Sequence, residues 1–439
     1  EPVYLVGGVL RDLALGLEPK DLDFATARPY EMARHFARRY GSKVVSLGKD
    51  ATPTYRIPLE ALRMDWVGLH GGSLEADLLR RDFTIDALGY DADEDRIHDP
   101  TEGIRDLQHR CIRMAYPGAF TDDPLRILKA YRLLAQLPGF RLDPGTLLAI
   151  QAQATALMDV APDRLQVELD RLLRLASPGR AVSDMAGSRI LFILMPELRA
   201  LKGLDQNDYH HTDVLTHSLE ALAFFDEPRR FPKEMKLPPF TQDHLLVLRL
   251  TALFHDAGKW ATRSAGEDGA VHFYGHPKPS ADAALEVLRR LRFPNSVAAA
   301  VSELCLNHLR PLALIKTAPR KTAIRRLIHS MGDLLPLLLA FGYADKSAAR
   351  GRDMEENLAA LRHLSQEVME TAATEGAELR HLPKLVDGLA AMAILGLKRP
   401  GPELGRALDA LLERQVEGTI TERGAAEAFL RKWAAKNLK

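Results

Sequence analysis

The feature that most limits what this chain can fold into is a change of pattern near residue 120. Before it, short apolar, β-branched runs alternate with short helical patterns. Five runs have the character of strands: 3–6, 21–26, 43–47, 53–67 and 88–98. From Thr121 the spacing of apolar residues is helical almost to the end. The sequence therefore predicts an α+β chain, with a small mixed β-sheet and helices at the start and a mostly α-helical remainder.

The helical remainder divides further. Residues 121–205 are expected to hold two or three helices, and a histidine-rich helical block fills about 206–350. Long helical periodicity resumes at 351 and is broken by "LKRPGPELG", after which a helix is expected over 402–417. The pattern predicts four parts, at 1–117, 118–205, 206–350 and 351–439.

Composition narrows the class of protein. The 439 residues carry 59 basic and 59 acidic side chains, so any basic surface for a nucleic acid must be local. Cys111 and Cys305 lie far apart and match no metal spacing, which is typical of buried thiols in a reducing cytosol. No signal peptide is evident, and the longest apolar runs are too short to span a bilayer. We therefore expect a cytoplasmic protein without a membrane partner.

Near the start, "YLVGGVLRDLALGLEPKDLDFAT" combines a glycine pair with two closely spaced carboxylates. Gly7 and Gly8 let the backbone pass close to a bulky group. The helix expected after them, over 9–17, starts with free N–H groups that suit a phosphate, which Arg11 can also reach. Asp21 and Asp23 point to one face of an expected strand, which is costly without a cation between them. The segment is typical of a nucleotidyl-transfer site; a plain turn and a solvated edge strand are the alternative.

Two later stretches carry similar chemistry. In "LLRRDFTIDALGYD", Arg80 and Arg81 precede an expected apolar helix and suit a triphosphate, although a solvated basic turn is the other interpretation. "FTDDPLRILKAYRLLAQL" predicts a helix that Asp122 or Asp123 caps and Pro124 begins. Polar residues recur every three positions along one broad face of it, which also fits a solvated amphipathic helix: Asp123, Arg126, Lys129 and Arg132.

In the histidine-rich block, His255 and Asp256 end an apolar helix. Two polar side chains are unfavourable there unless they bind something. Mixed histidine and aspartate ligands suit a divalent cation with open water positions. A hydrogen-bonded histidine in the core is the alternative.

The head segments, with "PDRLQVELDRLL", resemble the motifs of the class II tRNA nucleotidyltransferase and poly(A) polymerase family over essentially the whole chain. The resemblance implies that Asp21 and Asp23 are catalytic and hold Mg²⁺. The nucleotide-binding positions that it implies are Gly7, Gly8, Arg11, Arg81, Asp86, Asp123, Arg126, Lys129 and Arg132. Three positions depart from the family pattern: Asp86 replaces the usual Asn, Lys129 the usual Arg and Asp163 the usual Glu.

The resemblance assigns Asp123 and Arg126 to the base of the incoming nucleotide. CTP and ATP each present an amino donor beside a ring-nitrogen acceptor, which match an aspartate and an arginine. UTP and GTP present the opposite order and would leave buried polar groups unpaired, at roughly 1–3 kcal/mol each. One Asp–Arg pair can therefore select C and A without a nucleic-acid template.

The histidine-rich block resembles the HD phosphohydrolase superfamily. The resemblance implies that a divalent transition metal or Mg²⁺ binds at His217, His255, Asp256 and Asp345. It assigns His276 and His308 to a second metal or a substrate phosphate. The expected reaction is hydrolysis of a phosphomonoester or a cyclic phosphate.

One region predicts a narrower activity. In full CCA-adding members of the family, a strand ending in Arg-x-Glu runs into a flexible loop that moves the base-reading pair after two cytidines. Here only a short segment, containing "HGGSLEADLL", separates Arg63-Met64-Asp65 from Arg80. Without the loop the pair is expected to keep its C-binding arrangement, so that addition stops at CC. A shortened loop that still works is the alternative.

The resemblance thus implies a cytoplasmic tRNA nucleotidyltransferase with tRNA and CTP as partners, and ATP too if it completes CCA. A poly(A) polymerase would share the head motifs. A nucleotide or RNA-end phosphohydrolase, or a non-enzymatic RNA-binding protein, are rivals of other classes. The sequence leaves the oligomeric state open.

Overall fold

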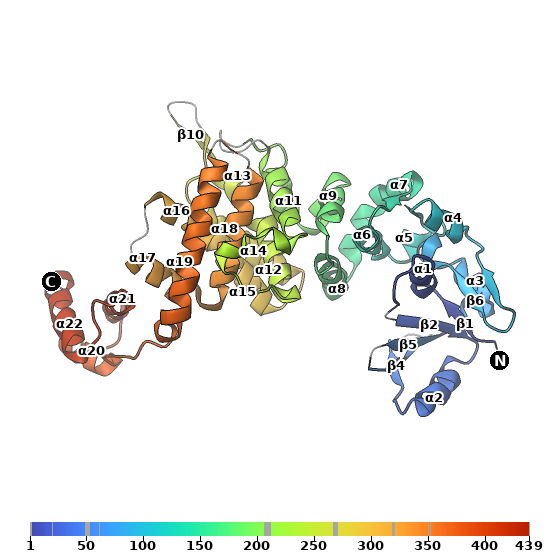
Figure 1. The fold of residues 1–439 in the computed structure, drawn as a ribbon, viewed down its shortest axis with the longest axis horizontal. Helices are drawn as coiled ribbons and strands as arrows, with labels where there is room; N and C mark the ends of the chain where they lie inside the picture. Colours follow the sequence, from blue (N-terminus) through green and yellow to red (C-terminus); the bar gives the residue numbers. More distant parts are fainter. Residues whose placement is uncertain are drawn as a thin grey trace. The chain divides into compact units, whose positions relative to one another are not determined.

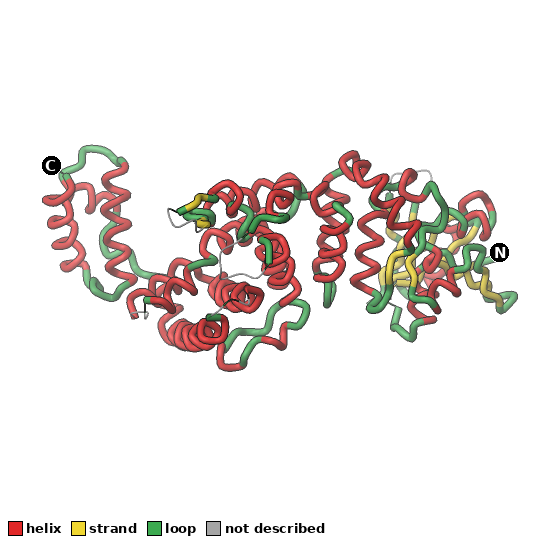
Figure 2. The backbone as a smooth tube through the Cα atoms, turned by 90° about the horizontal axis from the view of Figure 1, so that it is seen from above, coloured by secondary structure: helices red, strands yellow, loops and turns green. Residues whose placement is uncertain are grey.

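The computed structural model describes residues 2–19, 21–48, 53–60, 62–205, 212–266, 271–317, 321–349, 351 and 353–438. The chain forms two compact units, Glu1–Pro196 and Glu197–Lys439. Figure 1 shows a twisted sheet in the first unit and mainly helices in the second, and Figure 2 separates the same elements by colour. The predicted α+β class is confirmed, while the finer division into four parts stays a prediction.

The sheet of the first unit is mixed. Its strand order is β3–β4–β5–β2–β1–β6–β7, and among these described neighbours β2 and β5 alone run parallel. The strands are β1 (Tyr4–Val6), β2 (Asp21–Thr26), β3 (Val45–Leu47), β4 (Thr54–Pro58), β5 (Arg63–Gly68), β6 (Gly89–Asp91) and β7 (Arg96–His98). Strands β1 and β2 are central, so the residues that follow β1 and those along β2 meet in the middle of the sheet.

The two faces of the sheet have different cores. Helix α2 (Pro29–Arg39) covers one face, where Leu22 and Phe24 of β2 pack around Trp66. Helix α3 (Leu74–Leu78) packs against Ala25 on the other face. Because alternate residues of a strand point to opposite faces, Asp21 and Asp23 share the face of Ala25.

Several predicted elements are wrong in extent. The run 53–67 is two antiparallel strands, β4 and β5, and the run 88–98 is the hairpin β6–β7. The helix expected over 9–17 is α1 (Gly8–Ala14). In place of an apolar helix after Arg81, Thr84–Asp86 forms a single 3-10 turn.

The rest of the first unit is helical and holds more helices than the two or three predicted. Prolines and glycines break the apolar pattern into short pieces, with Pro144, Pro162 and Gly179 each at a helix start. The helices are α4 (Gly103–Gln108), α5 (Ala119–Asp122), α6 (Arg126–Gln136), α7 (Pro144–Gln153), α8 (Pro162–Leu173), α9 (Gly179–Gly187) and α10 (Ile190–Leu194). A two-stranded pair joins β8 (Cys111–Ile112) to β9 (Arg141–Leu142).

The second unit is built around a buried helix, α12 (Gln242–Phe254). A capping box at Thr241 and His244 starts it, and every residue from Leu245 to Phe254 is buried. The helices that follow or surround it are α11 (Val214–Phe224), α13 (Lys259–Thr262), α14 (Pro277–Arg290), α15 (Asn295–Asn307), α16 (Arg310–Lys316), α17 (Lys321–Met331), α18 (Leu335–Ala349) and α19 (Met354–Arg380). Strands β10 (Ser264–Ala265) and β11 (Val271–His272) form a small hairpin.

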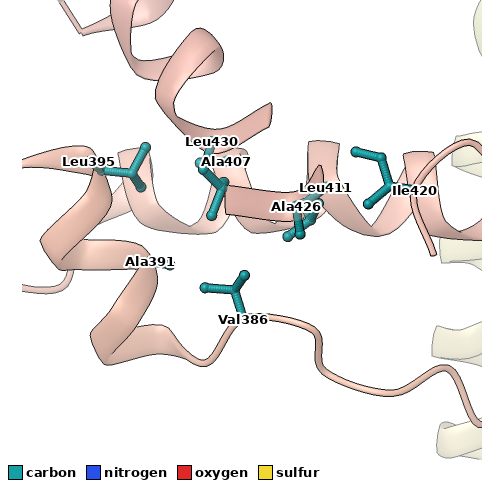
Figure 3. Close-up of a cluster of buried hydrophobic side chains, with 8 residues drawn as sticks. All are labelled: Val386, Ala391, Leu395, Ala407, Leu411, Ile420, Ala426 and Leu430. Carbon is teal, nitrogen blue, oxygen red and sulfur yellow. The ribbon is translucent and has the colours of Figure 1, made fainter. Parts of the chain in front are cut away.

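The end of the chain has a small core of its own. Helices α20 (Gly388–Leu395), α21 (Pro402–Val416) and α22 (Arg423–Asn437) meet around eight buried apolar side chains, among them Leu411 and Leu430 (Figure 3). The helix predicted to start at Pro402 is confirmed.

One stretch, Lys321–Ala349, is long and apolar enough by composition to cross a membrane. Its most apolar window is 61% buried inside the protein, as in a core helix, and a 3-10 turn at Gly332–Leu334 divides it. Both cysteines are free thiols.

Candidate active sites

The first unit holds a polar cavity of about 600 Å³ beside the middle of its sheet. Its lining comes from the ends of β1 and α3, the middle of β2 and the segments around Arg81 and Arg126. The lining residues are Gly7, Gly8, Asp23, His70, Asp77, Arg80, Arg81, Asp82, Asp86, Tyr116, Asp122, Arg126 and Lys129. Four cations face five carboxylates here, an arrangement suited to an anionic substrate with a metal ion.

Gly7 is required by two features of this cavity. Its φ is +84°, a conformation that side chains disfavour. A Cβ atom there would lie 2.8 Å from Nη1 of Arg81 and 3.3 Å from Oδ2 of Asp23. The backbone at the end of β1 is therefore open between a cation and a carboxylate, as the glycine pair predicts.

Asp23 lines the cavity, whereas Asp21 is more exposed and forms a two-bond ion pair with Arg63 at 2.5 and 2.9 Å. Burial raises the pKa of Asp23 to about 6; Arg81 opposes this, and the nearby carboxylates of Asp65 and Asp21 add to it. Carboxylates that repel one another on one strand face are the environment that a divalent cation relieves. Asp21 and Asp23 therefore fit a Mg²⁺ site on the chemistry of their oxygens.

The other cations of the cavity are held by carboxylates. Arg81 binds Asp77 at 2.9 Å, and Lys129 binds both Asp82 and, at 3.4 Å, Asp86. Burial lowers the pKa of Lys129, but these two carboxylates raise it. Lys129 therefore remains a cation.

Arg11 does not line the cavity. It is 5% exposed and donates to Asp86 at 2.5 Å and to Asp12. The aspartate that replaces the family's usual Asn at position 86 thus has a structural role, because it neutralises a buried arginine.

The two residues predicted to read the base differ in their relation to the cavity, although the N–H of Arg126 donates to the carbonyl of Asp123 at 3.1 Å. Arg126 lines the cavity, and its Nη1 donates to the hydroxyl of Tyr116 at 2.9 Å. Asp123 is outside the described lining: it accepts from the N–H of Leu125 at the start of α6 and forms an ion pair with Arg164 at 3.1 Å. Arg132 also lies outside this lining and donates to Glu168 at 2.8 Å.

The sequence interpretation assigned no role to Asp77, Asp82 or Tyr116, and it gave Asp122 only as one of two possible helix caps. Asp77 and Asp82 hold Arg81 and Lys129, and Tyr116 and Asp122 hold Arg126 and Arg80. Asp82 stands next to the paired arginines, which was a usable signal. Tyr116 has no such signal, because its role depends on contacts with residues after it along the chain.

The second unit holds a cavity of about 500 Å³ beside two clusters of potential metal-ligand side chains; five of their six residues line it, and His217 is buried behind them. In each cluster the potential ligand atoms lie within 4.8 Å of one another. One cluster is His217 of α11, His255 after α12 and Asp345 of α18; the other is Asp256, His276 at the start of α14 and His308 at the end of α15. All six residues predicted from the sequence therefore come together.

The two clusters adjoin each other. Nε2 of His255 lies 3.1 Å from Asp256 and 3.4 Å from Asp345, and Nε2 of His276 lies 3.2 Å from both Asp256 and His308. His255 and His276 each keep their Nδ1 on a backbone carbonyl, which aims Nε2 at the carboxylates. This is the orientation that a metal-binding imidazole needs.

The carboxylates of the two clusters favour a positive charge between them. Burial by itself lowers the pKa of His255, but the carboxylates of Asp256 and Asp345 raise it to about 10. Burial and the charge of His255 lower the pKa of His308 to about 3, so that its imidazole stays neutral. The buried carboxylate of Asp256 and the partly buried one of Asp345, among imidazoles, fit a divalent cation better than a structural hydrogen-bond network.

Close contacts surround Asp256 in the same cavity. Lys259 binds that carboxylate at 2.7 Å, and a Cβ atom on Gly258 would lie 2.5 Å from the carbonyl oxygen of His276. The backbone after α12 thus passes directly against the start of α14. The close approach explains why a glycine follows the His-Asp pair.

Family models and solved structures match the chain that carries these two sites. The family model of the poly A polymerase head domain matches residues 3–113, that of the probable RNA and SrmB-binding site of polymerase A matches 139–201, and that of the HD domain matches 214–335. Nucleotidyltransferases and HD proteins both use divalent metals. Among solved structures, a CCA-adding enzyme in complex with CTP covers 99% of this chain and 91% of its own at a TM-score of 0.58 and 21% identity, which shows the shared fold.

Two curated relatives extend over nearly the whole chain. The A-adding tRNA nucleotidyltransferase of Deinococcus radiodurans is 32% identical, covering 98% of this chain and 95% of the relative. The CC-adding tRNA nucleotidyltransferase of Thermus thermophilus is 35% identical, covering 98% and 93%. The chain therefore belongs to the tRNA nucleotidyltransferase and poly(A) polymerase family, in its CCA-adding class, and it carries an HD domain.

Proposed function

We propose that this enzyme adds two cytidines to the 3′ end of tRNA and stops. The observation that carries the proposal is the connection between β5 and Arg80. Ser73 caps α3 by accepting from the N–H of Ala76 at 3.2 Å, and Leu74 and Leu78 are buried against Val6 and Ala25. A segment packed into the sheet in this way is not free to act as a lever. The named activities of the two relatives divide between A and CC addition, so the proposal rests on this connection.

In the proposed reaction the cavity of the first unit holds CTP. Gly7, Gly8 and Arg81 lie against the triphosphate, and Asp21 and Asp23 hold Mg²⁺. The metal would supply activation of the RNA 3′ hydroxyl and neutralise charge on the leaving pyrophosphate.

Arg126 and Asp123 contact the base. The ion pair of Asp123 with Arg164 is exposed enough to be exchanged for the amino group of cytosine. Arg11, Asp86, Lys129 and Arg132 then act around this pocket by fixing its charges. We place the reaction in the cytoplasm.

The product ends decide the proposal. A tRNA transcript lacking CCA is incubated with CTP and ATP, and a second transcript ending in CC is incubated with ATP; the products of both are sequenced. We expect CC ends to accumulate on the first and the second to stay unchanged. CCA ends formed at a rate comparable to CC addition would overturn the proposal, as would A addition to the second transcript. Long A tails on mixed RNA would indicate a poly(A) polymerase.

We propose a second activity for the HD domain, hydrolysis of a phosphomonoester or a 2′,3′-cyclic phosphate. The observation that favours it is the pair of adjoining His/Asp clusters, five of whose residues line one cavity of about 500 Å³, with Lys259 beside them. The test is hydrolysis of nucleoside monophosphates and 2′,3′-cyclic nucleotides with Mn²⁺, Ni²⁺, Co²⁺ or Mg²⁺. No turnover by the wild type with any of these metals would remove the claim.

A further inference from the structure

We propose that Tyr116 is a positioning residue that locks Arg126 in the orientation that accepts cytosine. The inference rests on the proposed contact between Arg126 and the base. It concerns a side chain outside the recognised motifs, whose hydroxyl lies between Arg126 and an acidic neighbour.

The hydroxyl of Tyr116 is both a hydrogen-bond acceptor and a donor. It accepts a hydrogen bond from Nη1 of Arg126 at 2.9 Å and donates one to Oδ2 of Asp122 at 2.7 Å. A phenol can do both at once, and each bond has one charged partner, which strengthens it. Asp122 also accepts from Nη2 of Arg80 at 2.5 Å, so the acidic side chain cannot turn away without breaking an ion pair.

Two backbone carbonyls accept further hydrogen bonds from the guanidinium group of Arg126. Nη1 also donates to the carbonyl of Ala119 at 3.3 Å, and Nη2 donates to the carbonyl of Arg80 at 3.4 Å. Among the described residues, these bonds engage both hydrogens of Nη1 and one of Nη2. The Nε hydrogen and the second Nη2 hydrogen remain for a base.

The two remaining donors match cytosine. Cytosine presents two neighbouring acceptors, its ring N3 and its O2, to a donor pair. Uracil has an N–H at the ring position, which opposes a donor, and adenine has a C–H beside its ring acceptor. An arginine fixed with two donors outward therefore prefers cytosine to both, while a freely turning arginine discriminates less.

The ring of Tyr116 adds a second constraint. The guanidinium carbons of Arg80 and Arg126 lie 5.9 and 5.8 Å from its centroid, within the range of cation–π attraction. A phenylalanine keeps this contact and removes the hydroxyl alone. Tyr116→Phe therefore isolates the hydrogen-bond lock.

The experiment measures kcat and KM for CTP, UTP and ATP on tRNA lacking CCA and on tRNA ending in CC. In Tyr116→Phe we expect the ratio of CTP to UTP use to fall roughly 5- to 20-fold and A addition to CC ends to rise, as expected for a lost bond to a charged group. The thermal midpoint should stay close to wild type, because the ring keeps its contacts with Arg80 and Arg126. Tyr90→Phe is the matched control, because it loses a 2.9 Å bond to Asp95 in the β6–β7 hairpin and should change no ratio.

Two comparisons separate the possible failures. If Tyr116→Phe keeps the wild-type ratio while Arg126→Ala lowers it, the lock is refuted and base reading by Arg126 survives. If Arg126→Ala also leaves the ratio unchanged, the proposed base contact fails and the lock with it. Should Tyr116→Phe fold poorly, Asp122→Asn removes the charge that holds the hydroxyl and is expected to lower the ratio in the same direction; an unchanged ratio there refutes the lock.

Discussion

The cavities of the two units hold their charges in different ways. In the first unit, cations and carboxylates pair with each other near the surface, as in the Arg80–Asp122 pair with side chains 54% and 40% exposed. In the HD domain, His255 and Asp256 are at most 2% exposed and follow a helix that is buried from Leu245 to Phe254. The first cavity therefore combines an exposed, exchangeable ion pair with more buried ones such as Arg81–Asp77, whose side chains are 21% and 11% exposed, whereas the HD cavity is lined by more deeply buried potential ligands.

Under the proposed functions, the difference follows from what each cavity would bind. Exposed ion pairs contribute little to stability, so an incoming polyanion can replace the carboxylates around an arginine at small cost. Buried carboxylates beside imidazoles are costly unless a cation is shared between them, so their geometry must be fixed before the ion arrives. A cavity of exchangeable pairs needs separate contacts, such as those of Tyr116, to keep its specificity.

The largest expected effect tests whether the two cavities are independent. Asp21→Ala with Asp23→Ala should reduce nucleotide addition at least about 10³-fold, because metal-assisted activation is worth several kcal/mol. HD-domain hydrolysis should stay at the wild-type rate. Assays of nucleotide addition to tRNA and of phosphate hydrolysis on the same preparation measure both activities.

The control for this double variant is Asp93→Ala with Glu94→Ala, two exposed acidic residues in the turn of the β6–β7 hairpin. It should leave both activities unchanged. Addition persisting near the wild-type rate in the Asp21/Asp23 variant would contradict the metal assignment.

The reverse test is His255→Ala. Loss of a ligand that lies against both Asp256 and Asp345 should reduce hydrolysis at least about 100-fold while CC addition changes less than about twofold. His363→Ala, an exposed histidine on α19, is the matched control. Hydrolysis that survives the His255 change would show that the clusters are structural.

A smaller effect is expected from removing the proposed base contact in the first cavity. Arg126→Ala should lower discrimination against UTP by roughly 10- to 100-fold and raise the KM for CTP less, because Arg81 still holds phosphates. Competition between the four nucleotides on one tRNA measures it. Arg96→Ala, an exposed arginine on β7, should behave as wild type; an unchanged nucleotide preference in the Arg126 variant would remove the base contact.

The smallest expected effect is a pH dependence. Since burial raises the pKa of Asp23 to about 6, a proton competes with Mg²⁺ below that pH. The Mg²⁺ concentration for half-maximal addition should rise about fivefold between about pH 6 and about pH 5. A flat requirement over this range would argue against Asp23 as a ligand.

The same shift has a defined sign for stability. The folded pKa of Asp23 lies above the unfolded value, so the folded state binds the proton more tightly. Metal-free protein should therefore gain stability toward unfolding as the pH falls through about 6. Asp23→Asn should remove this part of the pH dependence, as urea unfolding at several pH values would show.

Much of the layout could be predicted from local pattern. The glycine pair between two strands and the histidines beside an apolar helix are signals contained in short segments. The break in the run 53–67 was also readable, because Pro58 cannot continue an inner strand.

The pairing of charges was not predictable. Arg11 and Asp86 are 75 residues apart, and Asp123 and Arg164 are 41 apart. Which carboxylate meets which arginine depends on how the sheet and helices pack, and several equivalent partners lie within reach of each cation. Sequence reasoning therefore placed Arg11 at the phosphates, whereas the structure buries it against Asp86.

The connection after β5 also bears on how such enzymes diverge. Its second half is anchored by Leu74 and Leu78, but His70, Gly71 and Gly72 before them are exposed. Extra residues inserted between the two glycines would extend into solvent without disturbing the sheet. Under the proposed function, gain or loss of a short insertion at this surface would change stability little but would change the product. CC-adding and CCA-adding enzymes could therefore interconvert by a single insertion or deletion.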